Sequence, residues 1–110
     1  MEYEQIVPVS KEEAEALLRT LEDEDLAKVL VAISNLDDVE YIESKYLLFI
    51  NHPNDICSGA AILGLAHMAR IHGLLNVQLV IGKLKELAKN RPSLQERVKE
   101  TLSDISIFIG

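Results

Sequence analysis

The residues of this 110-residue chain that could take part in chemistry are mostly carboxylates, and they are concentrated near its start. Residues 1–43 contain 13 Asp and Glu against 3 Lys and Arg, a net charge of −10, whereas residues 44–110 contain 5 against 8, a net charge of +3. A strongly acidic surface repels nucleic acid and anionic membranes and attracts basic proteins. We therefore expect a protein partner, with no nucleic acid and no membrane. A solvated acidic face without any partner is the alternative.

A set of acidic residues and one tyrosine forms the candidate partner-binding surface. They fall at the predicted ends and outer faces of the second and third helices, where neighbouring edges of a helical stack can form one continuous surface. Charge would steer a basic partner onto this surface, and the tyrosine would be an aromatic anchor. Tyr46 is either a second anchor or a core residue. The predicted surface residues are Glu22, Asp23, Glu24, Asp25, Asp37, Asp38, Glu40, Tyr41 and Glu43.

The spacing of the three histidines argues against a metal site. His67 and His72 lie on different faces of a helix, and His52 lies in a turn. We expect His67 to pair with Arg70, three residues later, and so to hold a helix end. His72 is expected to donate to the last carbonyls of that helix. We therefore expect no metal and no cofactor, and a small hydrolase using His52 or His67 is the least favoured function.

Cys57 is the remaining candidate for nucleophilic chemistry. Its predicted position near a helix N-terminus lowers a thiol pKa, but no neighbouring base completes a Cys–His pair, so we expect it to be buried packing. A single cysteine excludes an intrachain disulfide and suits a reducing cytoplasm. The first ten residues lack a secretory pattern. We predict a cytoplasmic protein that is not an enzyme.

The elements that must carry these residues are organised around the apolar run from Gly59 to Gly73. A helix that is apolar on nearly every face must be surrounded by other elements. The run is too short to span a membrane and contains Arg70. Asn54 can cap the helix, and the final glycine can end it. We predict a buried central helix over about 55–71.

Other helical patterns lie on both sides of this run, and none of the segments alternates as a strand would. We predict one all-α domain over residues 1–110, with 1–9 as an extended lead-in and about six helices in antiparallel hairpins. Two turns lie roughly 40 residues apart, the spacing of a short HEAT-like solenoid, although an irregular bundle is also possible. The predicted cap positions of the flanking helices are Ser10, Asp37, Asn76 and Ser93.

Residues 52–73 resemble a pattern found in small bacterial HEAT-like immunity proteins of contact-dependent growth inhibition and other polymorphic toxin systems. The C-terminal Asp104-Ile105 with Phe108 is similar to the last helix of that family. In the central pattern the family usually has Arg where this chain has Ser58. The residues that carry the central resemblance are His52-Pro53-Asn54 through Gly59, Leu65, His67 and Ala69-Arg70-Ile71-His72-Gly73.

The resemblance implies a protein that neutralises a cognate toxin by stoichiometric binding and contributes no catalytic group. It implies a monomer when free and a 1:1 complex with the toxin, whose gene normally lies directly upstream. The acidic residues favour a basic, nuclease-like toxin, because a nuclease must hold phosphates. A helical-repeat scaffold or adaptor without a toxin partner is the alternative. The resemblance does not identify the toxin.

Overall fold

The computed structural model describes Pro8 and residues 10–109, so most of the predicted extended lead-in lies outside the described residues. Within the described part the chain forms six α-helices and two short 3-10 turns, and no strand, which confirms the all-α class. The elements are α1 (Lys11–Thr20), α2 (Asp23–Ala32), η1 (Ile33–Asn35), α3 (Val39–Phe49), α4 (Asp55–Ile71), α5 (Val77–Asn90), η2 (Pro92–Leu94) and α6 (Gln95–Ile109).

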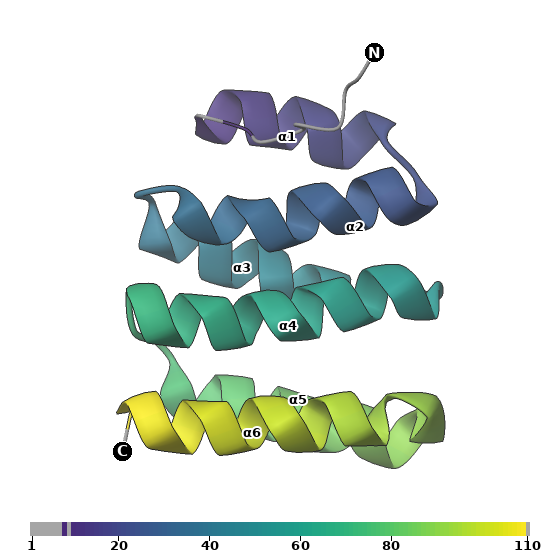
Figure 1. The fold of residues 1–110 in the computed structure, drawn as a ribbon, viewed down its shortest axis with the longest axis vertical. Coiled ribbons are helices and arrows are strands. Elements are labelled where there is room, and N and C mark those ends of the chain that lie inside the picture. Colours follow the sequence, from purple (N-terminus) through teal and green to yellow (C-terminus); the bar gives the residue numbers. More distant parts are fainter. Residues whose placement is uncertain (1–7, 9, 110) are drawn as a thin grey trace.

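The helices lie in two layers (Figure 1). Helices α2, α4 and α6 lie one below the other in front, and α3 and α5 lie behind them. The colour of each front helix advances from right to left in Figure 1, so these three helices run in the same direction. Helix α4 makes its most extensive contacts with α2 and α6 and also packs on α3, while α1 packs on α2 at one end of the stack. The assignment of this stack to HEAT repeats stays a prediction.

Helix α4 is the buried centre that the sequence predicts. The side chain of Asn54 accepts hydrogen bonds from the N–H groups of Ile56 and Cys57 and so caps the start of the helix. Gly73 follows its end with a φ of 80°, a conformation that favours glycine. Burial extends to most faces of α4, and the buried residues are Cys57, Ser58, Gly59, Ala60, Ala61, Ile62, Gly64, Leu65, Ala66, Met68 and Ala69.

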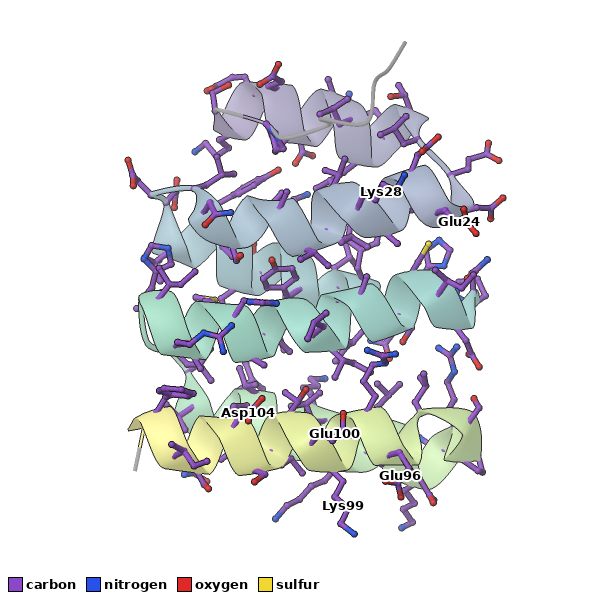
Figure 2. All side chains as sticks on the ribbon, viewed as in Figure 1. Glu24, Lys28, Glu96, Lys99, Glu100 and Asp104 are labelled. Carbon is purple, nitrogen blue, oxygen red and sulfur yellow. The ribbon has the colours of Figure 1, made fainter. Side chains whose placement is uncertain are left out.

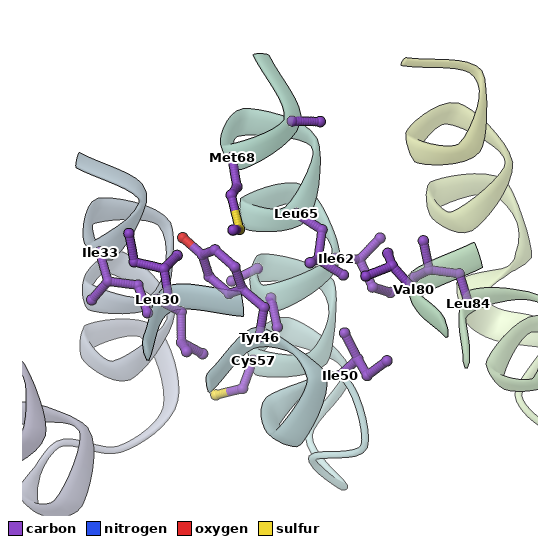
Figure 3. Close-up of a cluster of buried hydrophobic side chains, with 14 of the residues drawn as sticks. Leu30, Ile33, Tyr46, Ile50, Cys57, Ile62, Leu65, Met68, Val80 and Leu84 are labelled. Atoms are coloured by element: carbon purple, nitrogen blue, oxygen red, sulfur yellow. The ribbon is translucent and has the colours of Figure 1, made fainter. Parts of the chain in front are cut away.

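Tyr46 of α3 is a core residue and not an exposed anchor. Its side chain is fully buried, and Figure 3 shows it in the cluster between Leu30 and Met68. The ring lies directly against Gly64 of α4, where an added Cβ would overlap the ring atoms. The hydroxyl donates to the carbonyl of Val31 at 3.4 Å, and burial raises the pKa of the Tyr46 hydroxyl. Helices α3 and α4 can therefore approach closely only because residue 64 is glycine.

Glu43 of α3 is 2% exposed and binds the start of α5, so its predicted place on the partner-binding surface is wrong. One carboxylate oxygen accepts from the N–H groups of Leu75 and Asn76 at 2.9 and 3.2 Å, and the other accepts from Asn76 Nδ2 at 2.7 Å. Asn76 occupies the cap position of α5, but its side chain makes no bond to the α5 backbone. The predicted asparagine cap is thus replaced by a carboxylate from another helix.

The cap predictions for the remaining helices have mixed outcomes. Ser10 accepts from the N–H of Glu13 at 3.1 Å, as predicted. The cap of α3 is Asp38 and not Asp37, since Asp38 accepts from the N–H of Tyr41 at 3.0 Å. Ser93 lies inside η2, so α6 begins only at Gln95; the Ser93 side chain bonds to the carboxylate of Asp55. The Ser93 hydroxyl, which the sequence spacing predicts as a cap of the last helix, thus bonds to a residue far away in the sequence.

The Gly64→Ala substitution is expected to destabilise the fold by about 1–3 kcal/mol, because the new methyl group must displace a fully buried ring. Gly82→Ala in α5 is the matched control, since a Cβ there meets nothing within 4 Å. That control is expected to leave stability unchanged or to raise it by about 0.5–1 kcal/mol. Urea unfolding measures both changes. Equal stability of the two variants would contradict the close Tyr46–Gly64 contact.

The Glu43→Ala substitution is expected to lower the free energy of unfolding by about 1–3 kcal/mol, because it removes the acceptor of two backbone N–H groups and one side-chain amide at the start of α5. Glu40→Ala, on the exposed side of the same helix, is the control and is expected to change stability by less than about 0.5 kcal/mol. Thermal unfolding of both variants tests the difference. A Glu43→Ala variant as stable as its control would show that the carboxylate is dispensable.

Candidate protein-binding surface

Four consecutive carboxylates, Glu22 to Asp25, form an exposed acidic group at the start of α2, which we call the acidic end. Negative charge at this position is favourable because the N-terminus of a helix carries a partial positive charge. Glu22, Glu24 and Asp25 make no ion pair with any described residue. The acidic end borders a shallow hollow together with Asn54 and Ile56 of the neighbouring turn and helix. Its charge is thus available to a partner.

The backbone of the acidic end is held in place by α4. Asp23 has a φ of 52°, in the left-handed region that aspartate tolerates better than most residues. Its carbonyl accepts from Cys57 Sγ at 3.4 Å, and its carboxylate accepts from Asn54 Nδ2 at 3.3 Å. These contacts connect the turn before α2 to the start of α4. They fix the position of the acidic end relative to the core.

The other exposed acidic residues of the predicted surface form a second group, apart from the acidic end. Asp37, Asp38 and Glu40 are exposed near the start of α3, beyond the C-terminal end of α2. A ten-residue helix spans about 15 Å. The two groups are therefore separated by the length of α2. Within the second group Asp38 is already paired, since its pKa is lowered by the Tyr41 N–H and by Lys11 Nζ, which lies 3.2 Å away.

Tyr41 is half-buried in a polar cluster that joins α1 to α3. Its hydroxyl donates to Glu15 Oε1 at 2.6 Å, and Lys45 Nζ lies 3.0 Å from the same oxygen. These bonds lower the pKa of Glu15, while burial and the Glu15 charge raise the pKa of Tyr41. The ring also faces the ammonium groups of Lys11 and Lys45 at 5.9 and 5.5 Å. Tyr41 therefore stabilises the fold and is not a free anchor.

Two of the exposed apolar residues of α4 border the acidic end or the groove next to it, and the sequence analysis did not predict them. Ile56 is 53% exposed and borders the acidic end, and Leu63 is 36% exposed two turns further along the same face. Both line a groove between α2 and α4 that also reaches Arg97 of α6. Their spacing of seven residues, which places both on one helical face, was the available signal. It was hidden because the neighbouring faces of α4 are equally apolar.

The His67–Arg70 pair is present as predicted, since Arg70 Nη2 lies 2.7 Å from His67 Nδ1. Burial, and then the Arg70 charge, lower the pKa of His67, while the charge of Asp104 acts in the opposite direction. The guanidinium carbon of Arg70 also lies 5.8 Å from the ring centre of Phe108. This pair joins the last turns of α4 to the end of α6.

The other two histidines have structural contacts. His72 is the C-cap of α4, as predicted, and its backbone N–H donates to the carbonyl of Met68 at 2.8 Å. Its side chain contacts η1, with Nε2 2.9 Å from the carbonyl oxygen of Ser34. His52 Nδ1 accepts from the N–H of Asn54 at 3.0 Å, and its ring stacks on Phe49. Within residues 8 and 10–109, no group of three or more His, Cys, Asp or Glu side chains is arranged to hold a metal ion.

Cys57 is buried, as predicted, but the expected lowering of its pKa is wrong. Burial, and then the charge of Asp23, raise the pKa of the thiol. The helix N-terminus is outweighed because the thiolate would have to form away from water. The thiol instead donates to the Asp23 carbonyl.

None of the described helices is both long and apolar enough to cross a bilayer. Comparisons with protein-family models, with curated proteins and with solved structures found no match.

Replacing His67 with Asn is expected to weaken the dependence of stability on pH. The folded state lowers the pKa of His67, so the unfolded state binds the proton more strongly. The stabilisation by neutral His67 is fully present above the ordinary histidine pKa and is lost as the pH falls towards the lowered one. Unfolding measured between about pH 7.5 and about pH 5 should therefore show a smaller decrease for His67→Asn than for the unmodified protein. An equal decrease would contradict the lowered pKa.

Proposed function

We propose that this protein is an immunity protein that binds and blocks a cognate toxin with a basic surface, such as a nuclease. The observation that carries the proposal is the acidic end, where Glu22, Glu24 and Asp25 are exposed and without ion pairs among the described residues. The contacts of Asp23 to α4 hold these charges in a defined place. A rigid group of charges loses less conformational entropy on binding than a mobile one.

Charge complementarity accounts for inhibition without catalysis. A nuclease presents basic residues to the phosphates of its substrate. An acidic group bound over those residues would repel the substrate and occupy its place. The same charges would speed association by steering the two proteins together. The inhibitor needs only to occupy the site.

The resemblance to HEAT-like immunity proteins supports the same proposal. Several residues that carry it have structural contacts: His52 and Asn54 form the turn before α4, and His67 and Arg70 join α4 to α6. The resemblance therefore concerns the scaffold. Recognition of a particular toxin is left to exposed residues outside those contacts, and the acidic end is such a group.

The test is the binding of the purified protein to the C-terminal domain encoded directly upstream of its gene, at low and at high salt concentration. We expect tight 1:1 binding that weakens with salt, and protection of cells that produce the domain. The triple variant Glu22→Gln, Glu24→Gln, Asp25→Asn should associate about 10–100-fold more slowly. The double variant Asp37→Asn, Glu40→Gln, at the other end of α2, is the matched control and should bind normally.

Three other results would change the proposal. Absence of binding would reject the toxin and favour a scaffold or adaptor. Tight binding that is indifferent to salt would keep the immunity function and reject the role of the acidic end. Equal loss in the triple variant and in its control would show that only the total charge matters.

A further inference from the structure

The groove beside the acidic end has an apolar floor between basic side chains. Its apolar lining consists of the small residues Ala27, Gly59 and Ala60 and the larger residues Ile56, Leu63 and Val31. Three charged residues also line it, Lys28 of α2, Arg97 of α6 and Asp55 of α4, so the groove draws on all three front helices. Figure 2 shows Lys28 in the middle of α2, with Glu24 nearer the N-terminal end of that helix.

The cations of the groove are not neutralised within the fold. Neither Lys28 nor Arg97 makes an ion pair with a described residue. The side chain of Arg97 lies against Gly59, where an added Cβ would approach its Nε to 3.0 Å. Glycine at this position thus lets the guanidinium lie at the edge of the groove. Asp55, which also lines the groove, is already ion-paired with Arg91, so an incoming group meets two cations without ion pairs beside an apolar surface.

Exposed apolar side chains around a groove are typical of binding sites, because covering them removes apolar surface from water. Ile56 and Leu63 are such side chains on a helix that is otherwise mostly buried. Ile56 lines both this groove and the hollow at the acidic end. The two features therefore form one continuous surface with acidic, apolar and basic parts.

We propose that the groove receives an apolar side chain of the toxin from a segment that also carries a carboxylate, which the cations of Lys28 and Arg97 attract. This inference rests on the proposed function and specifies which part of the toxin enters the surface. Basic residues of the toxin lie over the acidic end, and the apolar side chain enters between Ile56 and Leu63. A toxin segment without the carboxylate would leave two cations covered and unpaired, which is costly.

The two parts of the surface have different kinetic effects. Long-range attraction to the acidic end mainly increases the association rate. Burial of an apolar anchor in a groove mainly slows dissociation. Loss of the groove contacts should therefore shorten the lifetime of the complex without changing its salt dependence. This difference separates the groove from the acidic end in one experiment.

The test uses the toxin domain encoded directly upstream and measures both rate constants. The double variant Ile56→Ala, Leu63→Ala is expected to dissociate at least about tenfold faster, with little change in association. Leu48→Ala, Leu79→Ala is the matched control, because both leucines are exposed but lie on the rear helices α3 and α5. Urea unfolding of each variant verifies that it is folded.

A charge reversal tests the carboxylate directly. Lys28→Glu, Arg97→Glu makes the surface more acidic, so simple attraction to a basic toxin predicts tighter binding. The proposed carboxylate predicts the opposite, a loss of about tenfold or more. Tighter or unchanged binding would overturn the proposal. Lys83→Glu, Lys99→Glu, outside the groove, is the control for net charge.

The experiments distinguish a failure of the proposed groove contact from a failure of the proposed immunity function. If the unmodified protein binds the toxin domain and the Ile56→Ala, Leu63→Ala variant dissociates no faster than its control, the groove is overturned and the immunity function stands. If the unmodified protein does not bind, both proposals are overturned. If the apolar variant weakens binding while the charge reversal strengthens it, the proposed segment is wrong because it carries no carboxylate.

Discussion

The burial of α4 is the constraint on which the rest of the structure depends. A helix that is apolar on nearly every side cannot lie at a surface, so it needs neighbours on more than one face. Helices α2 and α6 cover two of its sides, and α3 covers a third. Because Gly64 has no side chain, the Tyr46 ring lies directly against α4, and α3 packs closely on it. Each half of the stack is stabilised mainly through the same central helix.

Polar contacts between segments far apart in sequence then fix the ends of the stack. Glu43 joins α3 to the start of α5, and His72 joins the end of α4 to η1. At the other end, the Arg91 guanidinium donates to the carbonyl of His52 at 2.6 Å and forms an ion pair with Asp55. These bonds satisfy backbone groups that helix ends leave without partners. They hold the turns, and with them the neighbouring surface, in a defined arrangement.

The helices could be predicted from sequence because periodicity and short-range capping are local properties. Ser10 and Asn54 cap their helices as their spacing predicts. The candidate site was harder to predict from sequence, because it depends on which segments meet in space. The sequence pattern cannot distinguish the buried Glu43 from an exposed acid, since its partners lie more than thirty residues away. The groove was missed for the same reason: α2, α4 and α6 must meet before Ile56 and Leu63 border a common surface.

The separation between scaffold and surface has a consequence for how a partner can be changed. Residues such as Glu43, Tyr46 and Gly64 are buried in specific contacts, so substituting them should be costly to the fold. Glu24 of α2 and Leu63 of α4 are exposed, and most substitutions at exposed positions change stability by less than about 0.5 kcal/mol. Charge and shape at the acidic end and groove can therefore vary while α4 keeps its neighbours. The proposed immunity function would benefit from this division, because recognition of a toxin could change without a new core.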